Sequence, residues 1–440
     1  MRLPRTPGRP DPVSTVRLVL EHPELLHPEV KGQYLHWEEL RHRAAPEGCT
    51  HEQWWAAISL ARTGIRRNLP LHDSKGKAFG FAMTDTAQRA VHEIDRDASG
   101  QISLPEDVVT EGNRDHYIVS SLIEEAFRSS QLEGASTTRR VAKEMVSTGR
   151  DPRNQSERMI FNNFRAMEWS SSHKDAPLTP AAVLELHRLV TLDTLEDPDA
   201  AGRLRRHDEP VHVFDSADGE VLHVPPAANE LPTRMEALCA FANGTDEDSP
   251  FVHPVVRAIL LHFWLAYEHP FVDGNGRVAR ALFYWSMLRQ GYWLTEFLSI
   301  SRVISKARAQ YDRAFLYSES SESDATYFVV HQLGVIRTAI TDLHSYLRRK
   351  SGELHSVEQA LRTRGDLNPR QVTVIGEALR HPDTHFMIEG HQRMHRVSYQ
   401  TARTDLLGLT TLGYLEQHKA GRRLYFVPTP EIRKKLKPSR

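Results

Sequence analysis

Residues 269–280 read HPFVDGNGRVAR, and the interpretation of the whole chain starts from this stretch. Before it, residues 254–267 are almost wholly apolar and long enough to form a buried helix. His269 is expected to end that helix, because a residue that precedes proline avoids the helical region. Residues 277–288 predict a second helix. The stretch is therefore expected to be a tight loop between two helices.

The composition of this loop is suited to binding an anion. Gly274 and Gly276 allow backbone conformations in which successive N–H groups point into one concavity, and such a concavity binds anions. The second helix opens at this point, so its unpaired N–H groups and the positive end of its dipole add to the site. Asn275 can donate from its side-chain amide without adding charge. Together these residues predict a phosphate-binding loop.

Four side chains add the groups that chemistry on a nucleotide triphosphate needs. Asp273 is a hard oxygen ligand, which suits a Mg²⁺ ion carried by a nucleotide. Arg277 and Arg280 share one helix face, where their guanidinium groups can bind phosphate oxygens. His269 is the only loop residue whose unperturbed pKa allows it to take a proton from a hydroxyl near pH 7. The alternative is a helix–loop–helix corner with solvated polar side chains.

The same residues fit the signature HPFx(D/E)GNGRxxR, and the chain resembles the Fic family well beyond it. Members of that family move AMP from ATP onto hydroxyl groups of proteins. The resemblance implies a mainly α-helical core with a β-hairpin flap, which pairs with the target segment and holds its hydroxyl in line. Residues 201–206 and 211–226 look like this flap. Their alternating Val, His and Phe residues and the turn at Asp218-Gly219 agree with a hairpin.

The resemblance also assigns roles to individual residues. His269 would be the general base, and Asp273 would hold Mg²⁺ (or Mn²⁺) at the phosphates. Arg277 would bind the β-phosphate and Arg280 the γ-phosphate, while the α-phosphate is attacked and pyrophosphate leaves. The family's phosphate-transferring branch has lysine where Gly276 stands, so this position favours AMP transfer. The expected ATP-binding residues are Asp273, Gly274, Asn275, Gly276, Arg277, Arg280 and Tyr311.

The resemblance covers two further segments, which contain Tyr311 and Glu133. Tyr311 lies in a stretch that resembles a helix after the motif, where an aromatic lies near the adenine; a core tyrosine is the alternative. Residues 129–134, SSQLEG, fit the family's inhibitory pattern of Ser or Thr, three residues, Glu and Gly. Glu133 would then pair with Arg280 and make it unavailable to the γ-phosphate. In some relatives the same glutamate aligns a water that removes AMP, so Glu133 could also serve de-AMPylation.

Length and composition set the remaining expectations. The 440 residues allow several domains: an N-terminal lobe (1–110), an inhibitory helix segment (111–148), a Fic core domain (149–350), and a linker with a C-terminal domain (351–440). The net charge of -1 gives no global argument for nucleic acid or membrane binding. Two cysteines and the lack of a bilayer-spanning apolar run predict a soluble, cytoplasmic protein, with homodimerisation left open.

The C-terminal residues resemble a winged helix-turn-helix domain. Helices are expected at 369–379, at 386–394 and from a cap at Ser398 to about 412, followed by a hairpin at 413–427. The domain could bind DNA, or it could serve protein contacts or dimerisation. A DNA-binding regulator with a nucleotide-sensing Fic module is thus the second candidate function. The expected DNA contacts are Tyr399, Gln400, Arg403, Thr404, Arg422 and Arg423.

Two local patterns lie in the N-terminal part. Thr50 and Gln53 form a capping box, which predicts the start of a helix through Arg62. Residues 95–106 follow the calcium loop of EF-hands in every ligand position, but they have no second copy and residues 111–113 cut short an exit helix. A plain turn is the alternative, and this loop is not counted among the expected sites.

Overall fold

The computed structural model describes most of the chain, namely residues 3–7, 11–98, 114–148, 150–215, 219–244, 251–362, 367–380, 384–420 and 423–432. The chain forms two compact units, one of residues 1–102 and 119–341 and the other of residues 103–118 and 342–440. In the described residues helices predominate, and the strands form two two-stranded sheets and one three-stranded sheet. The mainly α-helical fold that the sequence predicts is confirmed. The predicted domain boundaries stay predictions.

The first unit contains all but the last elements of the chain. Two of its helices, α5 and α14, have residues in the second unit as well (114–118 and 342–362). In chain order its described elements are α1 (Pro12–Glu21), η1 (Pro23–Leu25), α2 (Trp37–Leu40), α3 (His51–Ile65), β1 (Arg67–His72), β2 (Ala78–Phe81), α4 (Asp85–Ala98), α5 (Arg114–Leu132), α6 (Arg139–Thr148), α7 (Gln155–Ser172), α8 (Pro180–Thr191), η2 (Pro198–Ala200), β3 (Val213–Phe214), β4 (Val221–His223), η3 (Ala228–Glu230), α9 (Leu231–Asn243), α10 (Pro254–Glu268), α11 (Asn275–Arg289), η4 (Trp293–Phe297), α12 (Ile300–Lys306), α13 (Arg308–Ser320) and α14 (Thr326–Arg362).

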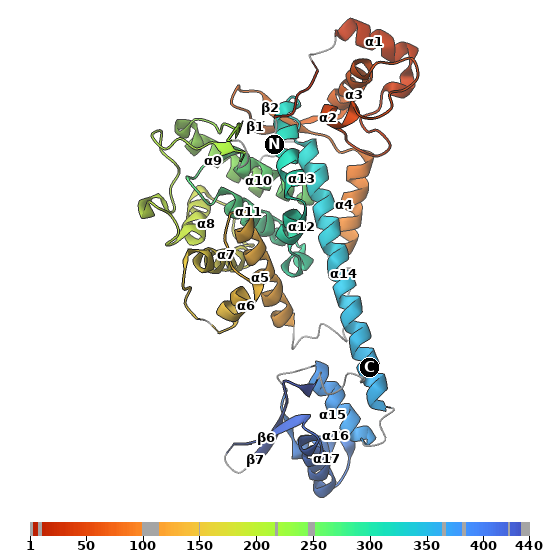
Figure 1. The fold of residues 1–440 in the computed structure, drawn as a ribbon, viewed down its shortest axis with the longest axis vertical. Helices are drawn as coiled ribbons and strands as arrows, with labels where there is room; N and C mark the ends of the chain where they lie inside the picture. Colours follow the sequence, from red (N-terminus) through yellow and green to blue (C-terminus); the bar gives the residue numbers. More distant parts are fainter. Residues whose placement is uncertain are drawn as a thin grey trace. The chain divides into compact units, whose positions relative to one another are not determined.

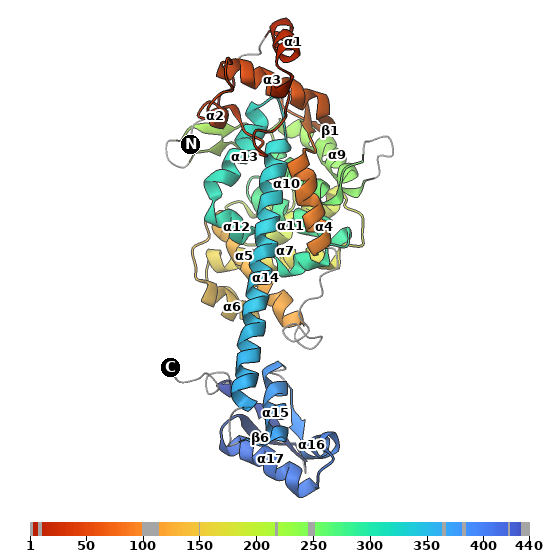
Figure 2. The ribbon, with the colours of Figure 1, turned by 90° about the vertical axis from the view of Figure 1, so that its right-hand side faces the viewer.

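Helices α10 and α11 lie at the centre of this unit (Figures 1 and 2). They pack against each other, and nearly every residue of both is buried. A helix that is apolar on all sides is stable only when other elements cover it. Here α7 and α8 pack on α11, and α9 packs on α10. The two helices that the sequence predicts around the loop are thus the core of the unit.

Helix α10 begins and ends where its sequence predicts. Pro254 takes the first helical position, where its missing N–H is not needed, and His253 accepts a hydrogen bond from the Val255 N–H. At the other end His269 adopts a left-handed conformation, with φ 46° and ψ 53°, and ends the helix before Pro270. The helix therefore carries His269 directly to the loop before α11.

The segment with the inhibitory pattern forms the end of α5. Ile123 and Phe127 of this helix belong to one buried cluster with Phe164 of α7. Gly134 has a left-handed conformation (φ 92°) and its N–H donates to a carbonyl of the last helical turn, so it ends the helix as predicted. The cluster fixes the helix, and Glu133 follows directly after its last residue.

The predicted flap is present as a short antiparallel pair of strands, β3 and β4. Val213 lies opposite His223 and Phe214 opposite Val221. Residues 216–218, including the expected turn residue Asp218, lie outside the described residues. The side chains of Phe214, Val221 and Val224 are exposed.

The N-terminal part of the unit confirms the predicted capping box. The N–H of Gln53 donates to Oγ1 of Thr50 and the N–H of Thr50 donates to Oε1 of Gln53, at 3.2 and 2.9 Å. Helix α4 runs beside the first half of α14 in both views (Figures 1 and 2). The first two positions of the calcium-loop pattern, Asp95 and Asp97, lie in the last turn of α4, and residues 99–106 of the pattern lie outside the described residues.

After α14, the described residues of the second unit form three short helices and a three-stranded sheet of order β5-β7-β6. This arrangement is compatible with the predicted winged helix, and Ser398 caps its third helix as predicted. One expectation is wrong: Phe386 and Met387 do not begin a helix but form a strand, because both pair with β7. DNA contact stays a prediction, and Arg422 lies outside the described residues. The elements are α15 (Pro369–Arg380), β5 (Phe386–Met387), α16 (Ile388–His395), α17 (Tyr399–Thr411), β6 (Leu415–Ala420) and β7 (Arg423–Pro428).

Among the described residues, no helix combines the length and the apolar character that a membrane crossing requires.

Candidate active site

The imidazole of His269 is held in the tautomer that a general base needs. Its Nδ1 lies 3.0 Å from the carbonyl oxygen of Ala266, which can only accept, so Nδ1 carries the proton and Nε2 keeps its lone pair. Burial lowers the pKa of His269 to about 4, and the positive charges of His223 and Arg205 act in the same direction. The ring is therefore neutral near pH 7 and able to accept a proton.

The loop after His269 is closed by Asn275. Its Oδ1 accepts from the N–H of Phe271 at 3.0 Å, and its Nδ2 donates to the carbonyl of the same residue at 2.8 Å. One N–H of the amide and its oxygen are thus used within the loop. Donation from the second N–H to an anion stays a prediction.

The first turn of α11 has no side-chain cap. Gly274 is its N-cap in a left-handed conformation (φ 86°), and no side chain caps this helix end. The first intrahelical hydrogen bond runs from Val278 to Gly274. The N–H groups of Asn275, Gly276 and Arg277 precede it and have no partner within the helix. Binding of phosphate by this loop stays a prediction.

Asp273 and Arg277 form an ion pair beside this helix end, with 3.0 Å between Oδ2 and Nη2. The guanidinium of Arg277 is wholly buried, and its Nε has no hydrogen-bond partner among the described residues. The carboxylate of Asp273 is 53% exposed. The described residues contain no group of three or more acidic, histidine or cysteine side chains that could hold a metal. The role of Asp273 as a ligand to a divalent cation stays a prediction.

Glu133 and Ser129, the first residue of the same pattern, both bind Arg280. Oε1 of Glu133 lies 2.6 Å from Nη2 of Arg280, whose Nε and Nη2 also donate to Oγ and the carbonyl of Ser129. The arginine side chain is almost wholly buried, whereas that of Glu133 is 27% exposed. Burial works against the charge of Glu133, but the guanidinium of Arg280 outweighs it and holds the carboxyl pKa below its ordinary value. The pair is therefore ionised at neutral pH.

Comparison with known proteins assigns this loop to a family. Residues 177–287 match the sequence profile of the Fic/DOC family. The chain contains a Fic domain. The protein adenylyltransferase Fic of Drosophila virilis is 38% identical over 115 residues, which are 26% of this chain and 21% of that protein. The enzyme of the same name from Nematostella vectensis is 30% identical over 183 residues, 40% of this chain and 39% of that protein. The chain thus spans well under half the length of these relatives.

A solved structure shows the same fold. The crystal structure of a Fic family protein from Desulfovibrio desulfuricans G20 aligns with a TM-score of 0.52 over 79% of this chain and 97% of that chain, at 21% sequence identity. At this identity the likeness concerns the fold alone. The helical core around α10 and α11 is therefore a Fic fold.

Tyr311, which follows the segment that matches the family, is largely buried, and its hydroxyl lies 2.9 Å from Nε2 of the buried His262. Burial raises the pKa of Tyr311, so its hydroxyl keeps its proton. The tyrosine lies on α13 near Arg280, whose charge acts on it. Its role beside an adenine stays a prediction.

The sequence did not single out Arg205 and His223, which connect the flap to the end of α10 and the loop after it. The guanidinium of Arg205 donates to the carbonyls of His269 and Pro226, and its backbone N–H donates to the carbonyl of Pro270. His223 contacts the carbonyl of Tyr267. Each contact joins residues more than twenty positions apart, so no local pattern reveals it. Both residues fall within the stretches that resemble the flap, and that resemblance was the only signal.

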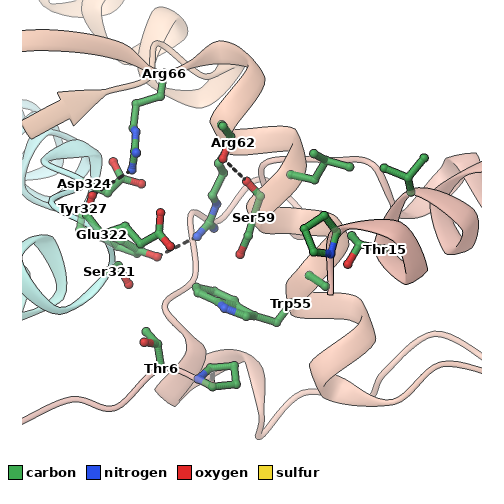
Figure 3. Close-up of a pocket in the computed structure, with 16 residues that line it drawn as sticks. Thr6, Thr15, Trp55, Ser59, Arg62, Arg66, Ser321, Glu322, Asp324 and Tyr327 are labelled. Atoms are coloured by element: carbon green, nitrogen blue, oxygen red, sulfur yellow. Dashed lines mark hydrogen bonds between the residues drawn. The ribbon is translucent and has the colours of Figure 1, made fainter. Parts of the chain in front are cut away.

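A cavity of about 380 Å³ in the N-terminal lobe is separate from the Fic loop (Figure 3). Arg62 and Trp55 lie at its wall, and Figure 3 shows the Arg62 side chain extended toward Tyr327. The guanidinium of Arg62 donates to Tyr327 and to the carbonyls of Pro28 and Leu35, and it lies 3.6 Å from the ring centre of Tyr34. This buried cation is thus satisfied by the protein itself, and its contacts hold α3 against the start of α14.

The contact between Gly276 and Glu133 leads to a stability prediction. A Cβ at Gly276 would overlap Oε1 of Glu133 and lie 3.0 Å from Nη1 of Arg280. Gly276→Ala should therefore push Glu133 off Arg280 and lower the free energy of unfolding by about 1–3 kcal/mol. In the Glu133→Gly chain the overlap is gone. There the same change should be neutral or stabilising by up to about 1 kcal/mol, as expected for Gly→Ala in a helix.

Denaturant unfolding of the four chains of this double-mutant cycle tests the contact without any assay of activity. The control is Gly334→Ala in α14, where a Cβ would meet nothing within 4 Å. It should stabilise both parent chains equally. An equal effect of Gly276→Ala in the two parents would contradict the contact.

Proposed function

We propose that this chain transfers AMP from ATP to a hydroxyl group of a protein, either a partner or the chain itself. The observation that carries the proposal is the uncapped N-terminus of α11, which is flanked by a neutral imidazole with a free Nε2 and by two buried arginines. The name protein adenylyltransferase, carried by the two relatives above, supports the same activity.

Each residue of the loop has a separate role in such a transfer. Nε2 of His269 takes the proton of the acceptor hydroxyl, whose oxygen then bonds to the α-phosphorus while pyrophosphate leaves with the electron pair of the broken P–O bond. The N–H groups at the start of α11 and the guanidinium groups of Arg277 and Arg280 stabilise the negative charge of the phosphates. A divalent cation such as Mg²⁺ or Mn²⁺, held through Asp273, would neutralise phosphate charge when bound.

The ion pair between Glu133 and Arg280 makes this activity self-limiting in our proposal. The γ-phosphate and the carboxylate would compete for one guanidinium group, and two like charges at such a distance are not compatible. With Glu133 in place the triphosphate is held without its γ-phosphate contact. This is why we expect slow transfer by the unmodified chain.

The position of the label in ATP tests the reaction itself. The Glu133→Gly chain is incubated with Mg²⁺ and ATP labelled at either the α- or the γ-phosphate. Label from the α-position should become acid-stable on protein, with one pyrophosphate released per label, and label from the γ-position should not. Transfer of γ-label would show a kinase reaction and refute the proposal.

The low pKa of His269 makes a prediction about pH. The ring must be unprotonated to act as a base, and its pKa is lowered to about 4. Transfer by the Glu133→Gly chain should therefore stay constant as the pH is lowered from 7 to about 5 and fall only below that, as the ring becomes protonated. Initial rates with saturating ATP, with circular dichroism as the check on folding, measure this. A decline centred near pH 6.5 would show an unperturbed histidine and contradict the tautomer argument.

A further inference from the structure

We propose that His223 of the flap is a positioning residue for AMP transfer, and that it acts as an imidazolium which ties strand β4 to both α10 and α13. The inference rests on the proposed function, because it concerns how a protein acceptor is brought to the same loop. It names a residue that neither the motif nor the chemistry of the loop includes.

The contacts of the ring require a positive charge. Nε2 of His223 lies 2.7 Å from the carbonyl oxygen of Tyr267, and Nδ1 lies 2.7 Å from Oε2 of Glu319 on α13. A carbonyl and an ionised carboxylate can only accept hydrogen bonds, so both ring nitrogens must donate. Only the imidazolium has two N–H groups. The side chain is 7% exposed, so water does not replace these partners.

The carbonyl that His223 binds belongs to the end of α10. In a helix the carbonyl of Tyr267 would accept from residue 271, but the N–H of Phe271 donates to Asn275 instead. His223 of the flap donates to the Tyr267 carbonyl in its place. Arg205 does the same for the carbonyl of His269, two residues further on. The flap therefore supplies the hydrogen-bond donors that complete the end of the helix carrying the catalytic base.

This arrangement links the place of an acceptor to the place of the base. Strand β4 and the residue after it expose Val221 and Val224, so an extended acceptor segment can lie along β4 close to His223. The attacking oxygen must lie within about 3–3.5 Å of the phosphorus, and small displacements reduce the rate strongly. A flap that is tied to Tyr267 keeps a fixed distance to His269. A flap that is released does not.

The charges around the ring favour the bound form. Burial alone would remove the proton, but the carboxylate of Glu319 and the carbonyl of Tyr267 oppose it, and the net effect raises the pKa of His223. Glu268 on α10 adds negative charge, and burial raises its own pKa to about 7. The ring of Tyr267 lies 4.9 Å away, and its hydroxyl keeps its proton because burial raises its pKa. On the other side His269 experiences the charge of His223, which helps to keep the base neutral.

The sign of the pH effect follows from this direction. A histidine whose pKa is raised by folding is fully protonated at low pH and then makes both hydrogen bonds. It loses one of them as the pH rises through the raised pKa. Transfer to a protein acceptor should therefore fall on the alkaline side, while binding of ATP at α11 should not. Glu319→Gln should move this alkaline decline to lower pH, because the neutral amide no longer favours the charged ring.

The experiment uses the full chain with Glu133→Gly as parent and adds His223→Gln or Glu319→Gln. The control is His22→Gln, since His22 forms an exposed pair with Glu24 at 3.1 Å. Self-labelling from α-labelled ATP is followed from about pH 6 to about pH 9, and the Kd for Mg·ATP is measured by calorimetry. His223→Gln should lower labelling about ten-fold or more with an unchanged Kd. Equal labelling in parent and His223→Gln, or an alkaline decline that Glu319→Gln leaves in place, would overturn the proposal.

A spectroscopic measurement separates this inference from the proposed function. In a chain with ¹⁵N-labelled histidines, the His223 signals are identified by their loss in His223→Gln. Near neutral pH both ring nitrogens should show imidazolium shifts, which Glu319→Gln should convert to those of a neutral ring. If the parent transfers no AMP, the proposed function fails, but these shifts still show whether His223 is an imidazolium that binds Tyr267 and Glu319. A neutral ring in the parent would overturn it.

Discussion

Replacing Glu133 with glycine should raise AMP transfer by about two orders of magnitude. The carboxylate occupies the guanidinium of Arg280 at 2.6 Å, and breaking a largely buried Arg–carboxylate pair costs about 3–5 kcal/mol. Since the side chain of Glu133 is 27% exposed, the lower end of this range applies, and about 3 kcal/mol corresponds to about 100-fold. Initial rates of labelling from α-labelled ATP, at equal protein and Mg²⁺ concentrations, measure the ratio.

The matched control for this effect is Glu124→Gln on the same helix. Glu124 pairs with Arg128 and Arg139, neither of which belongs to the loop. Its removal should leave the rate within about two-fold, since partly exposed ion pairs contribute little. If Glu133→Gly leaves the rate unchanged, the inhibitory role is wrong. If it abolishes the release of AMP from a labelled chain, Glu133 acts instead as a base in de-AMPylation.

Replacing His269 with alanine in the Glu133→Gly chain should lower the rate of transfer by about 10²- to 10⁴-fold. No other side chain of the loop can take a proton from the acceptor near pH 7: Asp273 is paired with Arg277, and the amide of Asn275 is bonded to Phe271. The binding of ATP should be retained, because the N–H groups of α11 and both arginines remain.

Two measurements on the same sample separate these outcomes. Labelling from α-labelled ATP reports the transfer, and calorimetric titration with Mg·ATP reports the binding. Loss of both would mean that His269→Ala disrupts the loop, and His269→Gln then serves as the milder variant. Full transfer without an imidazole at this position would exclude the proposed base.

The local parts of this structure could be predicted because the signals lie within a few residues. The capping box at Thr50, the cap at Ser398 and the glycine stop at Gly134 each depend on hydrogen bonds within one helical turn. The loop before α11 is also local, since its glycines and its two flanking helices are contiguous. The pairing of Glu133 with Arg280 is not local, because the two residues lie 147 positions apart. Its prediction therefore came only from the resemblance to the family.

Other parts depend on contacts that a single sequence does not show. His223 binds residues 44 and 96 positions away, so nothing near it in the chain indicates a charged ring. Phe386 and Met387 directly precede the residues of α16, so the sequence predicted them as part of that helix. Pairing with β7 makes them a strand instead. The sequence also did not indicate that the amide of Asn275 closes the loop through two hydrogen bonds with the backbone of Phe271.

The central claim is that the start of α11 binds the triphosphate of ATP and that Glu133 keeps Arg280 from its γ-phosphate. A crystal structure of the Glu133→Gly chain with Mg²⁺ and a non-hydrolysable ATP analogue tests this most directly. We expect phosphate oxygens on the N–H groups of residues 275–277, the γ-phosphate on Arg280, and the α-phosphorus facing Nε2 of His269. A nucleotide bound elsewhere, or bound here with Arg280 in contact only with Ser129, would contradict the account.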